Sequence, residues 1–284
     1  MALIVNTNIS SLNAQRNLAT SNQSLSVSLQ RLSSGLRVNS AKDDAAGSAI
    51  AEGLTSAIRG GNQSIRNAND GISVGQTAEG ALGQIANNLQ RIREISVQAS
   101  NGSISNTNRS QLQKEVDQLT QEISRIVQTT EFNGTKLLSG ASTITFQVGF
   151  SGSKDNQVSV DTSNLAQNGA AGLNAYSGDL TATGAVNVTT SGDASAAINK
   201  LDADIAQIAN IRATFGSVQN RFEAVVSNLQ NYVENLSASK SRLIDADFAA
   251  ETAQLTRNQI LQQAGTAILA QANTVPQGAL TLLR

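Results

Sequence analysis

The chain has 284 residues and a formal net charge of −1, with one Pro and no Cys, His or Trp. Absence of His removes the commonest metal ligand and general base, and absence of Cys removes disulfides and thiolate chemistry. The nearly balanced charge gives no basic face for nucleic acid, and the near absence of Pro permits long helices.

The N-terminal segment, up to about residue 30, carries a single charged residue and many Asn, Ser and Thr residues, which compete with helix through local hydrogen bonds. Its leucines nevertheless keep a heptad phase, interrupted at Asn22: Leu18, Leu25, Leu29, Leu32 and Leu36. We expect a helix here that needs a partner in order to form. Gly35 and Asn39 mark its end, and Ser40 or Asp43 can cap the next helix.

A second helix is expected from residue 44 to about residue 99. Its apolar seam shifts phase near Leu82 and consists of Leu54, Ile58, Ile65, Ala68 and Ile72, then Ile85, Leu89 and Ile92. Each glycine inside such a helix costs about 1 kcal/mol relative to Ala. This helix contains Gly53, Gly60, Gly61, Gly71, Gly75, Gly80 and Gly83. We interpret them as places where neighbouring helices approach closely.

A turn at Asn101-Gly102 leads into a shorter helix, which we expect to end at Asn133-Gly134. Its heptad seam consists of Leu112, Val116, Leu119, Ile123 and Ile126. Residues 140–192 are rich in Gly, Ser, Thr, Asn and Ala, with β-leaning stretches at 143–148, 157–160 and 185–189. One or two hairpins with loops are predicted in this region.

The most regular stretch of the chain is residues 198–236, where steps of three and four alternate without a break, as in a coiled-coil helix. Its apolar seam consists of Ile198, Leu201, Ile205, Ile208, Phe215, Phe222, Val226, Leu229, Val233 and Leu236. Asp193 can cap this helix. At about 57 Å, it needs other long helices beside it. Arg212 and Gln219 also fall on the seam, where they either fix its register or lie solvated at its edge.

The tail from Phe248 mirrors the first segment, because it is moderately apolar and poor in charge. Residues 258–283 carry no charge, but several Gln residues and Pro276 argue against a membrane span. The N-terminus lacks the basic and apolar regions of a signal peptide. The predicted fold is mainly α, with long antiparallel helices in a coiled-coil rod and a small β-hairpin region in the middle.

Several runs of this sequence resemble bacterial flagellin, in the family's order. They are residues 6–12 (NTNISSL), 29–47 (LQRLSSGLRVNSAKDDAAG), 67–73 (NANDGIS), 76–82 (QTAEGAL), 132–138 (FNGTKLL), 220–222 (NRF), 241–248 (SRLIDADF) and 282–284 (LLR). The resemblance covers about residues 1–140 and 193–284, and independent motifs near both termini make it specific.

The resemblance implies paired terminal helices, called D0 in the family, followed by a helical D1 with a hairpin. On this basis we expect residues 1–43 and 241–284 to form D0 and residues 44–140 and 193–240 to form D1. Residues 141–192 then form a short variable region in place of large outer domains. This is the pattern of a minimal flagellin.

The implied function is self-assembly into the extracellular helical filament used for motility. The partners are then copies of the chain itself, the hook-associated and cap proteins, an export chaperone and the flagellar export apparatus. Family members leave the cell unfolded, without a cleaved signal peptide. Neither a cofactor nor nucleic acid is expected.

One stretch resembles the flagellin segment read by a Toll-like innate receptor: Leu89, Gln90, Arg91 and Ile95, with Glu115 as a supporting acidic position. The family's usual Leu is replaced by Ile at position 95. These residues also fit a role in D1 packing. The tail residues Leu280, Leu282, Leu283 and Arg284 similarly resemble the part of flagellin used in assembly and sensed by cytosolic innate receptors.

Enzymatic function is not expected. The close carboxylate sets fit helix caps or polar helix faces: Asp43 with Asp44, Asp202 with Asp204, and Asp245 with Asp247. No phosphate-binding loop or nucleophile elbow is present, and a chain without His cannot build the zinc protease site that some flagellins carry. The alternatives are a hook-associated junction protein, which caps or connects, and a coiled-coil adaptor of fixed oligomeric size.

Overall fold

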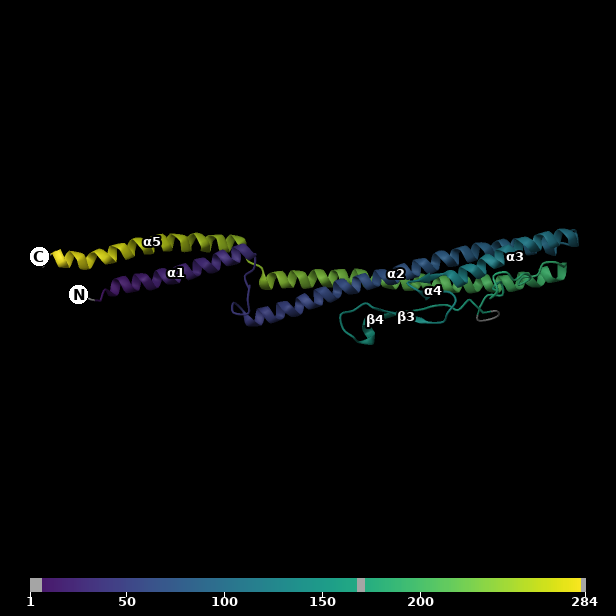
Figure 1. The fold of residues 1–284 in the computed structure, drawn as a ribbon, viewed down its shortest axis with the longest axis horizontal. Coiled ribbons are helices and arrows are strands. Elements are labelled where there is room, and N and C mark those ends of the chain that lie inside the picture. Colours follow the sequence, from purple (N-terminus) through teal and green to yellow (C-terminus); the bar gives the residue numbers. More distant parts are fainter. Residues whose placement is uncertain (1–6, 168–171, 282–284) are drawn as a thin grey trace. The chain divides into compact units, whose positions relative to one another are not determined.

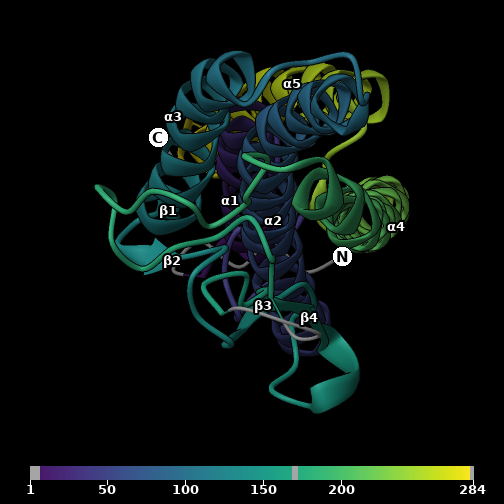
Figure 2. The ribbon, with the colours of Figure 1, turned by 90° about the vertical axis from the view of Figure 1, so that its right-hand side faces the viewer.

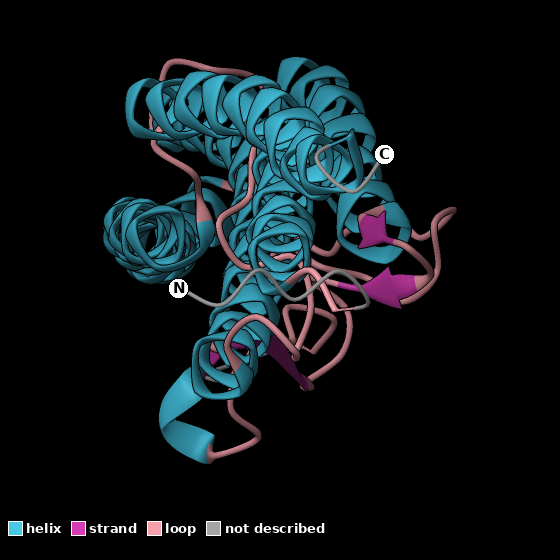
Figure 3. Ribbon diagram, turned by 90° about the vertical axis from the view of Figure 1, so that its left-hand side faces the viewer, coloured by secondary structure: helices cyan, strands magenta, loops and turns pink. Residues whose placement is uncertain are grey.

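The computed structural model describes residues 7–167 and 172–281 (Figure 1). In chain order the elements are α1 (Ile9–Ser34), α2 (Ala45–Ser100), α3 (Asn106–Thr129), β1 (Glu131–Phe132), β2 (Thr135–Lys136), β3 (Thr143–Gln147), the 3-10 helix η1 (Lys154–Asn156), β4 (Gln157–Asp161), α4 (Ser191–Ile244) and α5 (Phe248–Thr281). Figure 3 shows how little strand accompanies the helices. The prediction of a mainly α fold with long helices and a small hairpin region is confirmed.

Internal contacts divide the chain into two compact units, with boundaries inside α2 and α4. We call Met1–Ile58 with Glu234–Arg284 the terminal unit, and Arg59–Val233 the central unit. The D0 and D1 segments expected from the family resemblance, with boundaries between residues 43 and 44 and between residues 240 and 241, stay a prediction. The terminal unit therefore includes the first turns of α2 and the last turns of α4.

In the terminal unit, α1 and α5 lie side by side (Figure 1). Gly35 ends α1 in the left-handed conformation at φ 72°, where its N–H bonds to the carbonyl of Arg31 at 2.9 Å. This conformation suits glycine because it has no Cβ. The N–H of Ala246 donates to the carbonyl of Gly35 at 2.9 Å, and the N–H of Arg37 donates to that of Ile244 at 2.7 Å. The two connecting segments thus pair with each other.

Two helix caps differ from the prediction by one to four residues. Asp44, rather than Ser40 or Asp43, accepts the N–H of Gly47 at 2.8 Å and stands immediately before α2. The carboxylate of Asp43 instead accepts the N–H of Ser40 at 2.9 Å. At α4 the hydroxyl of Thr190 accepts the N–H of Asp193 at 3.1 Å, so Thr190 is the cap and Asp193 lies in the first turn.

The glycines of α2 are explained by close approach at four positions. A Cβ added to Gly71 would lie 2.5 Å from the ring of Phe222, and one added to Gly61 would lie 2.7 Å from Val233. An added Cβ would lie 2.8 Å from Gln219 at Gly75 and 3.0 Å from Phe150 at Gly60. At Gly53, Gly80 and Gly83 no described atom outside the surrounding helix backbone and adjacent residues comes within 4 Å of the added carbon, so the interpretation is wrong there.

The β-hairpin region is only partly as predicted. Strands β3 and β4 form the expected antiparallel pair, with Ile144 opposite Val160 and Phe146 opposite Val158. However, α3 ends at Thr129 instead of at Asn133-Gly134. Asn133 and Gly134, at φ 48° and 78°, form the two-residue turn between β1 and β2, where both central residues need positive φ.

The third predicted strand, residues 185–189, is wrong. Val186 and Val188 are buried as an alternating strand would require, but their backbone groups bond to a side chain of α3. Nε2 of Gln113 donates to the carbonyl of Val186 at 2.8 Å, and its Oε1 accepts the N–H of Val188 at 2.7 Å. Apolar alternation marks burial correctly but does not show whether the backbone partner is a strand.

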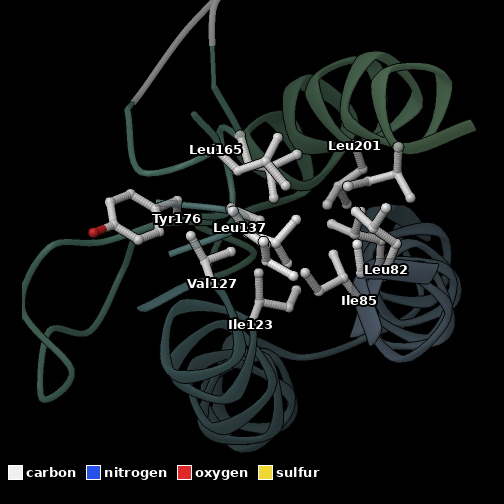
Figure 4. Packing of buried hydrophobic residues seen from close by; sticks show 14 of the residues in the cluster. Leu82, Ile85, Ile123, Val127, Leu137, Leu165, Tyr176 and Leu201 are labelled. Atoms are coloured by element: carbon white, nitrogen blue, oxygen red, sulfur yellow. The ribbon is translucent and has the colours of Figure 1, made fainter. Parts of the chain in front are cut away.

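The core of the central unit lies between α2, α3 and α4 (Figure 2). In Figure 4, Leu82 and Ile85 of α2 converge with Ile123 of α3 and Leu201 of α4, joined by residues from the α3–α4 connection. The fully buried seam positions are Val116, Ile123, Leu201, Ile208, Phe215 and Phe222. The partly buried ones are Leu112, Leu119, Ile126, Ile198, Ile205, Val226, Leu229, Val233 and Leu236.

Arg212 reaches from α4 to α2, where its guanidinium contacts one carboxylate oxygen of Glu79 at 2.7 Å. Gln219 packs over Gly75, as described above. Both polar seam residues of α4 therefore contact specific residues of α2 and favour one register of the two helices. Phe222, three residues after Gln219, is fully buried and meets Phe146 edge-on, with ring centroids 5.4 Å apart.

Candidate functional site

The seam between α1 and α5 is built from small and polar side chains. Ser11, Ala14 and Ser28 are its buried residues on α1. The hydroxyl of Ser11 donates to Asn273 at 2.9 Å, and the side chain of Asn8 donates to the carbonyl of Ala272 at 2.7 Å. Such a seam fixes how the two helices pair but removes little apolar area from water.

Several large apolar side chains of the same two helices are exposed, whereas Leu18, Leu25, Leu255 and Leu269 are partly buried. On α5 the exposed ones are Phe248, Ile260, Leu261 and Ile268, of which Ile260 and Ile268 are each 59% exposed. On α1 they are Ile9, Leu12 and Leu29, while Val27 lines the groove between the two helices. The leucine heptad predicted for α1 is therefore wrong at Leu29, which is half exposed. Ile260 and Leu261 also line a shallow surface hollow with Ala253. Exposed apolar surface of this kind is typical of an interaction site.

The tail residues selected from the sequence cannot be placed on this surface. Leu280 lies within α5, but its side chain is outside the described part of the structure. Leu282, Leu283 and Arg284 lie outside the described residues altogether. The apolar surface is therefore defined by residues 9–29 and 248–268.

A second candidate surface is a charged cluster in the central unit. Arg91 of α2 donates from Nε to Glu115 of α3 at 3.0 Å and from Nη1 to Glu94 at 3.1 Å. The hydrogen bond to Glu115, followed by that to Glu94, raises the pKa of Arg91, and the guanidinium stays charged. Gln90 is exposed beside it. This cluster presents both signs of charge to solvent.

Two residues predicted to belong to this surface do not reach it. Leu89 and Ile95 are 0% and 1% exposed and pack in the core of the central unit. Leu89 is two positions before Arg91 and faces another side of the helix, whereas Ile95, one turn after Arg91, is buried by the packing of the central unit. The exposed part of the predicted surface is therefore Gln90, Arg91 and Glu115, with Glu94 beside them, while Leu89 and Ile95 are buried in this structure.

Sequence reasoning missed a stripe of buried polar residues on α3 that binds the segment before α4. Besides Gln113, the carboxylate of Asp117 accepts the N–H of Gly184 at 2.9 Å, and the hydroxyl of Ser124 accepts that of Ser177 at 3.0 Å. These side chains are polar at helical spacing, which in a sequence is indistinguishable from a solvent face. Only the tertiary fold shows that their partners are backbone groups.

Asp204 of α4 holds the start of the same segment. Its two carboxylate oxygens accept the N–H groups of Asn174 and Ala175, each at 2.9 Å, and it is 1% exposed. Burial raises the pKa of this carboxyl group, and the hydrogen bonds oppose the rise. The role visible in the structure is to fix a loop.

Two further carboxylates of the sets noted in the sequence also have structural contacts. Asp202 pairs with Arg93 at 2.6 Å, and Asp247 accepts the N–H of Ala249 at 2.9 Å at the start of α5. Within the described ranges, no cluster of three or more acidic residues has the geometry of a metal site. Across residues 7–167 and 172–281, none of the helices combines the length and apolarity of a membrane span.

Comparison with known proteins identifies both ends of the chain. Residues 5–143 match the bacterial flagellin N-terminal helical region, and residues 198–283 match the bacterial flagellin C-terminal helical region. A flagellin of Xenorhabdus nematophila is 46% identical over 318 aligned residues, and polar flagellin F of Vibrio parahaemolyticus is 36% identical over 376. Both alignments cover 100% of this chain and of the relative.

Among solved structures, a putative flagellar hook-associated protein from Vibrio parahaemolyticus matches with a TM-score of 0.57. The match covers 72% of this chain and 100% of that one, at 15% sequence identity. At this level of identity, the likeness is one of fold alone.

Proposed function

The chain belongs to the bacterial flagellin family, the structural subunits of the extracellular flagellar filament, and we propose that its copies polymerise by burying the outer apolar face of α1 and α5. The observation that supports this most directly is the exposure of Phe248, Ile260, Leu261 and Ile268 on one helix. The filament would serve motility, with export of the chain unfolded and without a cleaved signal peptide.

The energetics favour assembly through this face. Burying a fully exposed Ile, Leu or Phe side chain contributes about 1.5–3 kcal/mol, and these four side chains are each about half exposed, so together they offer several kcal/mol. A neighbour that covers them with a different surface of its own makes a heterologous contact. Such contacts repeat without closing and generate a helical polymer.

The α1/α5 seam is too small to stabilise the two helices by itself, because ordering each residue costs about 1–2 kcal/mol of backbone entropy. We propose that both helices order when a copy joins a filament end. Growth then depends on existing ends, and a free copy does not present the apolar face permanently.

The test is seeded elongation. A chain with Ile260→Gln and Ile268→Gln should keep the helical content of its central unit but fail to elongate on wild-type filament seeds. A chain with Gln263→Ala, which changes an exposed polar residue of the same helix, should elongate normally. Normal elongation of the double variant would refute the proposed interface.

The rival function, a hook-associated junction protein, makes a different prediction. Such a protein would bind a filament end but would not elongate it, whereas the proposed filament subunit adds many copies. The full-length similarity to flagellins supports elongation. The hook-associated and cap proteins, an export chaperone and the export apparatus are then proposed partners of this chain.

Recognition by a Toll-like innate receptor is a second proposed function, supported by the exposed cluster of Gln90, Arg91 and Glu115. The planar guanidinium of Arg91 can bind a carboxylate with two parallel hydrogen bonds. Replacing Arg91 by Ala should reduce receptor signalling by the monomer, while Arg93→Ala, which changes another exposed ion pair of α2, serves as the matched control. Unchanged signalling by the Arg91 variant would refute this role. Sensing of the Leu280–Arg284 tail by cytosolic receptors stays a proposal from family resemblance.

A further inference from the structure

Asn258 lies on the inner face of α5 and is 3% exposed, yet its Nδ2 has no hydrogen-bond partner. Among the described side chains, only this atom and Oε2 of Glu79 are buried in this way. The other oxygen of Glu79 is held by Arg212. The Oδ1 of Asn258 accepts a long hydrogen bond, 3.5 Å, from Nε2 of Gln254 on the same helix.

The orientation of the Asn258 amide does not remove the problem. Turning the amide by half a turn would place Nδ2 against the donor Nε2 of Gln254, and Oδ1 would take the unpartnered position. Leaving a buried donor or acceptor unpaired destabilises a fold by more than a typical hydrogen bond stabilises it, because the group loses its hydrogen bonds to water and forms none in the protein.

The surroundings of Asn258 are loosely packed. The residue lines a groove of about 380 Å³ between α1 and α5, whose α1 wall includes Thr20, Ser24 and Val27. Val27 is 37% exposed there. An apolar side chain at position 258 therefore has room to extend and an apolar neighbour to cover.

The other polar groups of the seam contrast with Asn258, because they are paired across the two helices. Ser11 donates to Asn273, Asn8 donates to the carbonyl of Ala272, and Arg31 lies 3.8 Å from Glu251. These contacts set the register of α1 on α5. Asn258 lies between these contacts but forms no hydrogen bond to α1, so its burial destabilises the pair.

We propose that Asn258 further weakens the α1/α5 pair, whose seam is already small, and so lowers the paired fraction in a free copy and favours pairing at a filament end. The inference rests on the proposed assembly function and assigns one residue a part in making it conditional. An apolar residue at this position would raise the fraction of free copies in which α1 and α5 are paired, and these copies would present Ile260 and Ile268 before assembly.

The test compares three full-length variants as dilute monomers: Asn258→Leu, Asn258→Ala and Gln259→Leu. Gln259 is the exposed neighbour on the same helix, so its variant controls for added helix propensity and apolarity. Amide hydrogen exchange of α1 and α5 gives the ratio of paired to open helices. We expect Asn258→Leu to raise this ratio at least about tenfold and to shorten the lag of unseeded polymerisation, with Gln259→Leu within about twofold of wild type.

Equal behaviour of the two leucine variants, or a ratio for Asn258→Leu within twofold of wild type, would overturn the proposal. If the larger side chain of Asn258→Leu lowers pairing by clashing, Asn258→Ala decides: an increased ratio supports the proposal and an unchanged or lower one overturns it. Wild-type chain that fails to elongate on seeds would refute the proposed assembly function, and the exchange ratios would still decide whether Asn258 weakens the pair.

Discussion

Gly71 and Gly80 lie in the same helix and differ in what a side chain would meet. A Cβ at Gly71 would lie within 2.8 Å of three ring carbons of Phe222, whereas at Gly80 no described atom outside the surrounding helix backbone and adjacent residues lies within 4 Å. Phe222 cannot retreat easily, because it is fully buried and its ring meets Phe146 at an interplanar angle of 87°.

The expected magnitudes follow from two opposing effects. Replacing Gly by Ala stabilises an open helix position by about 1 kcal/mol, while overpacking a core costs about 1–3 kcal/mol. Gly80→Ala should therefore raise the free energy of unfolding by about 1 kcal/mol, and Gly71→Ala should change it by between about 0 and −2 kcal/mol.

The assay is equilibrium urea unfolding of the full-length monomer, followed by helical circular dichroism. Wild type and both single variants are compared at a concentration below that at which filaments form. The slope of each transition should stay unchanged, so that a shift of the midpoint reports stability. An equal increase of stability in both variants would refute the reasoning, because it would show that α2 and Phe222 separate at little cost.

Three further outcomes are expected from the same unfolding assay. Arg109→Ala should lower the free energy of unfolding by about 2–4 kcal/mol, because the buried guanidinium binds the carbonyls of Ala99 and Asn101 at 2.7 and 2.9 Å. Arg109→Lys should not restore this stability, because a single ammonium cannot reach both carbonyls, and full restoration by Lys would contradict the reasoning. Burial raises the pKa of Asp204, so the folded chain holds this proton more tightly than the unfolded chain does. The stability of wild type relative to Asp204→Asn should therefore increase as the pH falls from neutral to about 4. A decrease in this relative stability would mean that the N–H donors to Asp204 affect its pKa more than burial does. Arg212→Ala should lower the free energy of unfolding by no more than about 1 kcal/mol, because the pair with Glu79 is partly solvated. A larger loss would show that the pair contributes more than a solvated surface ion pair does.

The long helices were predictable because their signals are local and repeated. The seam from Leu201 to Phe222, with one fully buried residue every seventh position, needs only the heptad rule. The Asn133-Gly134 turn was visible in the sequence as well. Its place in a hairpin after α3 was not, because the helix ends four residues earlier, at Thr129.

The candidate surfaces were less predictable, because they depend on which face of each helix is covered. Leu89 and Ile95 lie close to Arg91 in sequence, but both are buried in the core. Gln113 and Asp117 are buried because a loop bonds to them, and this pairing joins segments about 70 residues apart. Asn258 is one of many uncharged polar residues in a charge-poor tail, and only the packing of α1 on α5 distinguishes it.

The central claim is that the outer apolar face of α5 is covered by other copies of the chain. The chain contains no Cys, so Ile268→Cys introduces a single thiol at a position that is 59% exposed in the isolated chain. Its rate of reaction with a soluble maleimide should be measured in monomers, in filaments grown from the same protein, and in filaments dissolved by denaturant. We predict that the rate falls at least about tenfold on assembly and recovers on dissolution. A thiol that reacts equally fast in monomer and filament would contradict the account.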